Sequence, residues 1–187
     1  MGEQNKLQNK ALKSGERKVA RKLSQLSDWQ IGRYKGSLEY ILDGDTVLDA
    51  GCGCGMGTYI LSEKAKKITG IDDSPESIEF ANLYWKKDNI EYIHRDVFLE
   101  KNIYDIVVAN ELVEHVKNIE ELFVLFGKIT AKYLIITTPS ISIKPMNKWH
   151  WRHYSEEEMI GLYNKNNFEV IKTEFLAHPY YVGIKND

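Results

Sequence analysis

The fold of this chain is decided by residues 47–55, which read VLDAGCGCG. A short apolar run leads straight into a glycine-rich loop, and a helical pattern follows at about 55–64. Glycines lack a Cβ atom and take positive φ, so a ligand can approach the backbone closely, and the start of a helix favours a carboxylate or phosphate. The stretch therefore predicts a ligand-binding turn between a strand and a helix. The alternative is a glycine-rich turn that binds nothing.

Strand-like and helix-like patterns alternate on either side of this loop. Apolar runs of strand length occur at residues 47–48, 68–71, 90–93, 103–109 and 133–137. Helical patterns occur at 27–42, 55–64, 74–88, 117–130 and 155–166, with start signals at Ser74-Pro75 and at Ser155 with Glu158. Such alternation predicts a parallel sheet with helices on both faces. Runs at 168–175 and 180–184, joined by a turn with Pro179, predict a closing antiparallel hairpin.

Length and composition indicate one domain of ordinary character. The chain has 187 residues, 28% of them charged, and a formal net charge of -2, which gives no overall attraction to nucleic acid or membranes. We expect the domain to occupy residues 27–187. Residues 1–26 form a basic arm in which only Glu3 and Glu16 are acidic. We interpret the arm as mobile or loosely helical, although an RNA-contacting arm or a transit peptide would have similar composition.

The two cysteines and the hydropathy pattern bear on the setting of the protein. Cys52 and Cys54 lie too close together in a sharp turn to predict a disulfide, and no second group of soft ligands accompanies them. We therefore expect no metal site. No apolar run approaches the roughly 20 residues that span a bilayer, and no secretion signal is apparent at the amino terminus. We expect a cytoplasmic protein that does not enter the membrane.

The glycine loop resembles one family of enzymes in particular. The dinucleotide fingerprint G-x-G-x-x-G is not met, because Met56 stands in place of the third glycine. The loop resembles the first motif of the class I methyltransferases, an acidic residue followed by G-x-G-x-G. The matching residues are Asp49, Gly51, Gly53 and Gly55. The resemblance implies an α/β, Rossmann-like three-layer sandwich with a seven-stranded, mostly parallel sheet and an antiparallel C-terminal hairpin. It also implies S-adenosylmethionine as cofactor, with the loop backbone, Cys52 included, against its methionine part and Asp49 orienting its amino group.

Further acidic residues follow the next strands in the order that this family uses. Asp72 comes 23 positions after Asp49, at the end of the second predicted strand, where a carboxylate can accept from both ribose hydroxyls. Asp73 is a possible helper, and the alternative for the pair is helix capping. The resemblance implies that Asp96, beside Val97, accepts from the adenine amino group, and we add Asn110, which ends the fourth strand, to the cofactor set.

The segment after the fourth strand reads ELVEHV at residues 111–116. It closely resembles the E-x-L-E-H-V segment of ubiquinone-pathway-type and related small-molecule methyltransferases. It lacks the N-P-P-Y tetrapeptide of many amino-group methylases, which argues against an adenine or glutamine amide acceptor. We predict that Glu111 contacts the substrate and that His115 accepts a proton from a substrate hydroxyl. The alternative for His115 is a structural brace.

A second segment, NKWHWRHYS at residues 147–155, resembles the N-P-x-H-x-R-E-[FY]-[ST] segment of methyltransferases in sugar and polysaccharide biosynthesis. Lys148 replaces the proline of that pattern, and His153 replaces the glutamate. We predict that Arg152, His153 and Tyr154 contact the substrate and that His150 is a second candidate base. Alternatively, the segment is a helix lead-in packed on the core.

Together these motifs predict O-methylation of a small hydroxylated or sugar-containing molecule. Three rivals stay open: a nicotinamide-dependent oxidoreductase, which the missing third glycine disfavours; an RNA methyltransferase that uses the basic arm, although we do not expect a nucleic-acid partner; and a non-catalytic module that binds the cofactor. The sequence leaves the oligomeric state open.

Overall fold

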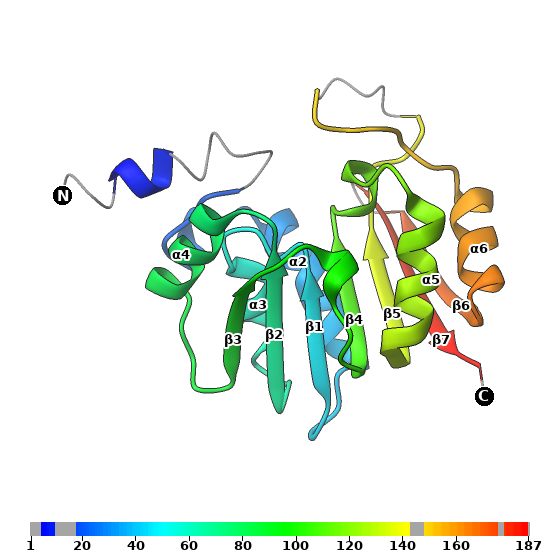
Figure 1. The fold of residues 1–187 in the computed structure, drawn as a ribbon, viewed down its shortest axis with the longest axis horizontal. Coiled ribbons are helices and arrows are strands. Elements are labelled where there is room, and N and C mark those ends of the chain that lie inside the picture. The colour runs from blue at the N-terminus through cyan, green and yellow to red at the C-terminus, as the bar shows by residue number, and fades with distance from the viewer. Residues whose placement is uncertain (1–4, 10–17, 143–147, 176–177, 187) are drawn as a thin grey trace.

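The computed structural model describes residues 5–9, 18–142, 148–175 and 178–186. Within them, seven strands form one sheet in the order β3-β2-β1-β4-β5-β7-β6 (Figure 1). The strands are β1 (Thr46–Ala50), β2 (Lys67–Asp72), β3 (Ile90–His94), β4 (Tyr104–Asn110), β5 (Thr130–Thr137), β6 (Phe168–Phe175) and β7 (Pro179–Lys185).

The pairing confirms the predicted mixture of parallel and antiparallel strands. β1 to β5 pair in parallel, whereas β7 pairs antiparallel with both β5 and β6. The strand order reverses between β1 and β4, because the chain first builds outward to β3 and then returns to the other side of β1. In open α/β sheets, ligands bind outside the carboxyl ends of the strands at such a reversal.

The helices match the predicted ones in position but are generally shorter. They are α2 (Asp28–Ser37), α3 (Met56–Leu61), α4 (Pro75–Tyr84), α5 (Ile119–Ile129) and α6 (Glu156–Lys165). The helix predicted at 27–42 gives way at Leu38 to the 3-10 turn η2 (Leu38–Tyr40), where the Leu38 N–H bonds to Lys35 and Gly36 carbonyls. The start signals are confirmed: Ser155 and Glu158 form a capping box, and Ser74 accepts from the Ser77 N–H ahead of α4.

Two hydrophobic clusters cover the two faces of the sheet, which gives three layers. Neighbouring residues of a strand point to opposite faces, so Leu48 packs in one cluster with α5 and α6 while Val47 packs in the other with α3. α5 and α6 lie in front of the sheet in Figure 1, and α2 and α3 lie behind it.

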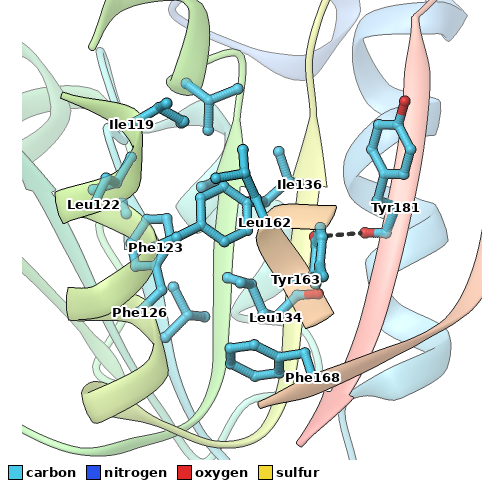
Figure 2. Close-up of a cluster of buried hydrophobic side chains, with 14 of the residues drawn as sticks. Ile119, Leu122, Phe123, Phe126, Leu134, Ile136, Leu162, Tyr163, Phe168 and Tyr181 are labelled. Carbon is cyan, nitrogen blue, oxygen red and sulfur yellow. Dashed lines mark hydrogen bonds between the residues drawn. The ribbon is translucent and has the colours of Figure 1, made fainter. Parts of the chain in front are cut away.

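Aromatic residues join α5 and α6 to the C-terminal strands (Figure 2). The rings of Phe123 and Tyr163 meet edge to face with centroids 5.3 Å apart. The Tyr163 hydroxyl lies 3.3 Å from the Leu134 carbonyl oxygen and 3.4 Å from that of Tyr181, so its only polar group is satisfied in the interior. Each such side chain contributes roughly 1.5–3 kcal/mol by burial.

The described parts of the basic arm contact the domain. Leu7, in a helical turn at residues 5–9, is buried in the same cluster as α3, and so is Ala20. The Trp85 indole N–H donates to the Ala20 carbonyl oxygen at 2.9 Å. Residues 1–4 and 10–17 lie outside the described residues, and the domain boundary at residue 27 stays a prediction. Among the helices that are described, none has the length and apolar character to cross a membrane.

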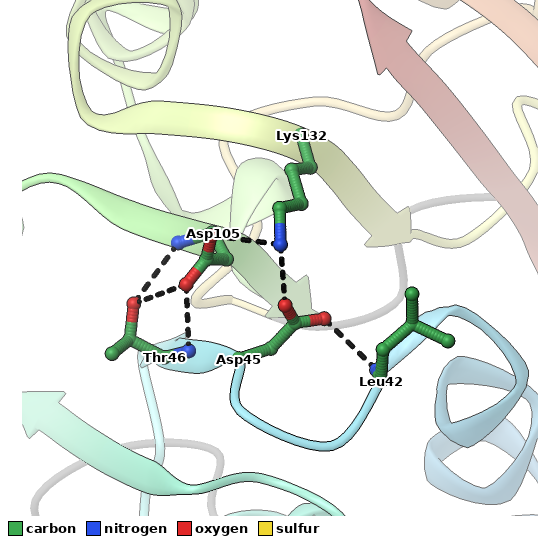
Figure 3. A network of polar contacts seen from close by, with 5 residues as sticks. All are labelled: Leu42, Asp45, Thr46, Asp105 and Lys132. Carbon is green, nitrogen blue, oxygen red and sulfur yellow. Dashed lines mark hydrogen bonds and ion pairs between the residues drawn. The ribbon is translucent and has the colours of Figure 1, made fainter.

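A polar network closes the amino-terminal end of the sheet, opposite the strand ends that face the cavity described below (Figure 3). Asp105 of β4 accepts from the backbone N–H and the hydroxyl of Thr46 in β1, both at 2.9 Å. Lys132 of β5 lies 2.5 Å from Asp45 and 3.0 Å from Asp105. Burial alone would raise the pKa of Asp105, but the hydrogen bonds from Thr46 and Lys132 outweigh it and lower that pKa.

We expect Asp105→Ala to reduce the free energy of unfolding by about 1–2 kcal/mol at neutral pH, because the Thr46 groups lose a charged acceptor. The Asp105 pKa is lower in the folded chain than in the unfolded one, so its contribution is present above the unfolded pKa and is lost as pH falls through the folded pKa. Urea unfolding from pH 7 to pH 3 measures this difference. Glu91→Ala, which breaks the exposed Lys67–Glu91 pair, is the control and should cost less than about 1 kcal/mol. An equal cost for both variants, or one that does not shrink in acid, would contradict the role given to Asp105.

Candidate functional site

A cavity of about 550 Å³ lies at the carboxyl ends of β1, β2 and β4. Its volume falls in the range of small-molecule sites. One group of lining residues follows β2 and β3, and we call it the β2 side: Asp72, Asp73, Arg95, Asp96, Val97 and Phe98. The other group follows β4 or comes from the 148–154 segment, and we call it the β4 side: Asn110, Glu111, Leu112, His115, Val116, Lys117, Asn118, Trp149 and Trp151. The loop after β1 lies between them, because β1 separates β2 from β4 in the sheet.

The glycine loop can take its shape only with glycine at two positions. Gly51 has φ of 72°, and a Cβ there would lie 2.9 Å from Leu112. Gly55 has φ of 89°, and a Cβ there would lie 2.6 Å from the Cβ of Ala81. The Gly51 and Cys52 N–H groups both donate to the Ile71 carbonyl oxygen at 2.9 Å. Residues 51–54 line the cavity, whereas Gly55 does not, so a bound molecule would contact the backbone of residues 51–54.

Asp72 is held in place by two backbone amides on the β2 side. Its Oδ2 accepts from the Gly53 N–H at 2.9 Å, and its Oδ1 accepts from the Ser74 N–H at 3.0 Å. Asp72 is only 7% exposed yet borders the cavity. Its two oxygens offer about four lone-pair sites, so it can still accept from hydroxyls of a ligand. Asp73 also lines the cavity, and its carbonyl oxygen lies 3.0 Å from the His94 Nε2 atom.

Asp96 and Val97 border the same side of the cavity. The Asp96 side chain accepts from the Phe98 N–H at 3.0 Å and caps the 3-10 turn η3 (Val97–Leu99). This bond leaves the second carboxylate oxygen able to accept from a ligand, and Val97 and Phe98 add apolar surface beside it. The cavity thus has a carboxylate at each of two positions, as expected for a ligand with separate donor groups.

Two buried polar side chains beside the loop lack a hydrogen-bond partner at some atoms within the described part of the chain. Asn110 lines the cavity, and neither its amide oxygen nor its amide nitrogen is bonded there. Asp49 accepts from the Thr58 hydroxyl at 2.6 Å through Oδ2, while its Oδ1 is unbonded. Burial raises the pKa of Asp49 to about 6, although the Thr58 hydrogen bond acts against this. Buried polar groups are normally paired, so these atoms fit a ligand with polar groups of its own.

Both cysteines of the loop, Cys52 and Cys54, are buried and line the cavity. Burial raises the pKa of the Cys52 thiol well above its usual value, which keeps it neutral. A neutral thiol is a poor nucleophile and a poor metal ligand, so Cys52 serves as a small apolar group in the wall.

Glu111 is the most strained residue on the β4 side. Its φ of 55° is unusual for a residue with a Cβ atom and costs on the order of 1–3 kcal/mol. Its carboxylate accepts from His178 Nδ1 at 2.6 Å and from the Thr137 hydroxyl at 3.1 Å, and the Arg33 guanidinium lies 3.8 Å away. Strain of this kind persists where surrounding contacts hold the residue, and it is common at functional sites.

Three histidines and a glutamate lie together at the outer edge of the β4 side. His115, in the 3-10 turn η4 (Val113–His115), has its Nδ1 atom 3.1 Å from the Trp149 carbonyl oxygen. His150 packs edge to face on His115 with ring centroids 4.8 Å apart, and its Nδ1 lies 2.7 Å from His153 Nε2. The Thr138 hydroxyl donates to buried Glu114 at 3.3 Å. His115 lines the cavity, so the structure brings together both histidines that the sequence nominates as bases.

The three predicted substrate residues of the 148–154 segment lie away from the described cavity wall. Arg152 pairs with Glu158 and stacks over the Tyr154 ring, 4.7 Å from its centroid. Tyr154 packs in the core cluster of α5 and α6, and His153 is buried against His150. In this conformation they position the segment, and their contact with substrate stays a prediction.

Several wall residues were not predicted from the sequence. Arg33 comes from α2, whose pattern indicated only an apolar face, and Lys18 comes from the basic arm. His178 reaches the site through Glu111, 67 positions earlier in the chain. Trp149 and Trp151 belong to the NKWHWRHYS segment, and its aromatic residues were a sequence signal that could have placed them in the wall.

Gly57 has a packing reason rather than a ligand-binding one. A Cβ at this position would lie 2.1 Å from the ring of Tyr34, which is buried and lines the cavity. Gly57 therefore lets α2 approach α3 closely enough for Tyr34 to form part of the wall.

Comparison with protein families gives one match that covers most of the chain. Residues 12–173 match the family model described as "Methyltransferase domain". A curated relative, ubiquinone biosynthesis O-methyltransferase of Rickettsia typhi, is 31% identical over 79 residues, which cover 40% of this chain and 32% of the relative. Pavine N-methyltransferase of Thalictrum flavum is 40% identical over 87 residues, which cover 43% of this chain and 24% of the relative. The chain thus spans a third or less of these relatives' length.

A solved structure shares the fold. The magnesium protoporphyrin IX methyltransferase of Synechocystis PCC 6803, crystallised with bound SAH, superimposes with a TM-score of 0.76 at 13% sequence identity. The superposition covers 99% of this chain and 95% of that one. The overall path of the chain is therefore that of a known methyltransferase fold.

We expect Gly57→Ala to lower the free energy of unfolding by about 1–3 kcal/mol, because the added methyl overlaps the Tyr34 ring. In a Tyr34→Ala background the same change should cost much less, which a double-mutant cycle in urea measures. Gly161→Ala in α6 is the matched control, since its Cβ would meet nothing within 4 Å. That control should be neutral or stabilising by up to about 1 kcal/mol. Equal costs of Gly57→Ala in both backgrounds would disprove the packing role.

Proposed function

The chain belongs to the methyltransferase-domain family, and from this premise we propose that it transfers a methyl group from S-adenosylmethionine to a hydroxyl oxygen of a small molecule. The observation that carries the proposal is the division of one cavity into two sides. The β2 side and the glycine loop present anchored carboxylates and backbone for the cofactor. The β4 side presents histidine, glutamate and tryptophan for an acceptor.

The cofactor assignment rests on three features in chain order. The glycine loop gives close backbone access for the methionine part. Beside it, Asp49 and Asn110 hold polar atoms that have no hydrogen-bond partner among the described residues. Asp72 is oriented to accept from the two ribose hydroxyls. Asp96 with Val97 suits the adenine ring and its amino group. The bound cofactor supplies an electrophilic methyl group on a sulfonium.

The acceptor assignment rests on the residues after β4. The ELVEHV segment places Glu111 and His115 in the cavity wall, and Trp149 and Trp151 add flat apolar faces that suit a ring with polar edges. The O-methyltransferase name of the Rickettsia typhi relative agrees with a hydroxyl acceptor. A small aromatic or sugar-like hydroxyl compound is the substrate class that these groups fit best.

The chain's work in this reaction is mainly positioning. As the acceptor oxygen forms its bond to the methyl carbon, the carbon–sulfur bond breaks and S-adenosylhomocysteine leaves, so the two reactants must be held in line at near-attack distance. The Trp149 carbonyl oxygen accepts from His115 Nδ1–H, so the lone pair of the ring lies on Nε2. That nitrogen can take the acceptor's proton.

We expect Asp72→Ala to weaken binding of S-adenosylhomocysteine by one to two orders of magnitude, because two ribose hydroxyls lose a charge-assisted acceptor worth about 1.5–3 kcal/mol. Isothermal calorimetry measures the effect, with NADH as the competing ligand. Asp73→Ala is the comparison variant and should change affinity far less. Binding of NADH but not of S-adenosylhomocysteine by the wild-type chain would refute the cofactor assignment, and unchanged affinity in Asp72→Ala would move the ribose contact elsewhere.

For the base, we expect His115→Ala to lower kcat by about 10²- to 10⁴-fold with little change in cofactor affinity, the usual effect of removing a general base. His150→Ala should mainly raise the acceptor KM, because His150 packs against His115 at the edge of the acceptor side and does not line the described cavity wall itself. Both variants are tested by single-turnover rates from pH 6 to 9. The protein is treated with a chelator, and the acceptor is a hydroxyl compound that the wild type methylates. Nearly full kcat in His115→Ala would reduce His115 to a brace, and loss of kcat in His150→Ala alone would transfer the role.

A further inference from the structure

We propose that Glu114, His115 and His150 bind a divalent transition-metal ion of the zinc type at the outer edge of the acceptor side. One carboxylate oxygen and one nitrogen from each ring lie within 4.8 Å of one another. Metal binding at this cluster does not depend on methyl transfer. Only the use of the ion, described below, rests on the proposed methyl transfer.

The three side chains come from two segments that the fold holds together. Glu114 and His115 belong to η4, while His150 belongs to the 148–154 segment. The Trp151 N–H donates to the Glu114 carbonyl oxygen at 2.8 Å, which ties the two segments beside the cluster. Tetrahedral zinc with ligands at about 2.1 Å needs ligand atoms roughly 3.4 Å apart. Binding would therefore draw the partly exposed His150 inward by about an ångström.

Neighbouring groups contact one nitrogen of the His115 ring and one of the His150 ring, as they do for histidines that bind metals. Ligating histidines usually donate their second ring N–H to a carbonyl or other acceptor, which fixes the tautomer. His115 Nδ1 faces the Trp149 carbonyl oxygen, and His150 Nδ1 faces His153 Nε2 at 2.7 Å. A carbonyl oxygen can only accept, so His115 carries its lone pair on Nε2. When His150 Nδ1–H donates to His153 Nε2, the lone pair of His150 also lies on Nε2, and this is the arrangement that metal binding would select.

The ligand set matches catalytic rather than structural zinc chemistry. Two histidines and one glutamate leave a fourth position for water or substrate in zinc hydrolases, and imidazole with carboxylate suits zinc among the common divalent ions. Glu114 is 1% exposed. A carboxylate in such a buried position is held at low dielectric, where its attraction to a cation is stronger than in water.

The position of the cluster gives the ion a role in the proposed reaction. His115 lines the cavity next to Lys117 and Asn118, so the open position can face an acceptor. An acceptor hydroxyl bound there would have its pKa lowered by the ion. Its proton would go to solvent, the oxygen lone pair would form the carbon–oxygen bond, and the carbon–sulfur bond would break as S-adenosylhomocysteine leaves. His115 would then act as a ligand when the ion is bound and as a base when it is absent.

The test is metal uptake by untagged, full-length protein stripped with a chelator. We expect one equivalent of Zn²⁺ by calorimetry, and for Co²⁺ the visible absorption bands of a tetrahedral site. His150→Ala and Glu114→Gln should each weaken binding at least about 100-fold. His153→Phe, which removes the partner of His150, should weaken it by about 10- to 100-fold. His94→Ala, an exposed histidine beside Asp73, is the control and should bind the ion as the wild type does.

Two outcomes would overturn the assignment: no stoichiometric uptake by the wild type, or uptake that survives both His150→Ala and Glu114→Gln. Thermal melting of each variant without metal shows whether it is folded, and His150, being partly exposed, is the safer position to change. Calorimetry with S-adenosylhomocysteine on the same stripped protein tests the cofactor separately. Zinc uptake without cofactor binding would support the metal site and refute the proposed function. Cofactor binding without zinc uptake would support the proposed function and refute the metal site.

Discussion

The site depends on the Asp72 carboxylate and the two backbone N–H groups that it accepts from. One bond reaches Gly53 in the loop after β1, and the other reaches Ser74 at the start of α4. A single side chain thereby fixes the loop against the end of β2 and the beginning of the next helix. Hydrogen bonds to an ionised acceptor are the strong ones, so the loop keeps its shape although it consists largely of glycine. The same carboxylate then faces the cavity, which makes the structural anchor and the predicted ribose contact one group.

Burial of carboxylates sets the second constraint, on the other side of β1. Glu111 is partly buried and Glu114 is buried, both just past β4, and charge withdrawn from water must be compensated. Glu111 is compensated by His178, Thr137 and Arg33, which come from three separate parts of the chain. Glu114 accepts from Thr138 and lies beside His115 and His150. The acceptor side is thus built from residues that contact two glutamates. The contacts of Glu111 with His178, Thr137 and Arg33 hold its backbone at a positive φ.

The strands with their antiparallel finish, the helix starts and the residues of the β2 side could be predicted from the sequence because their determinants are local. The glycine loop, Asp72 and Asp96 each follow directly on a strand, and parallel strands bring their carboxyl ends together. The β4 side could not be predicted as fully. His178 meets Glu111 across 67 positions, and His115 meets Trp149 across 34, so no local pattern reports either pairing. Arg33 could not be predicted for another reason: an amphipathic pattern shows which face of α2 is buried, but it does not show that Arg33 borders a cavity.

The way in which the 148–154 segment is attached affects which side of the cavity, the β2 side or the β4 side, tolerates substitutions. Trp149 and Trp151 are bonded through their backbones to His115 and to Glu114, both in η4. None of these bonds involves the glycine loop, Asp72 or Asp96. Backbone contacts tolerate changes of side chain, so the aromatic wall can be altered while the segment stays in register with η4. The cofactor side, in contrast, is fixed by backbone geometry at Gly51 and Gly55 and by the Asp72 carboxylate, which leaves it little freedom. A scaffold divided in this way can keep one cofactor and change its acceptor through substitutions on the β4 side alone.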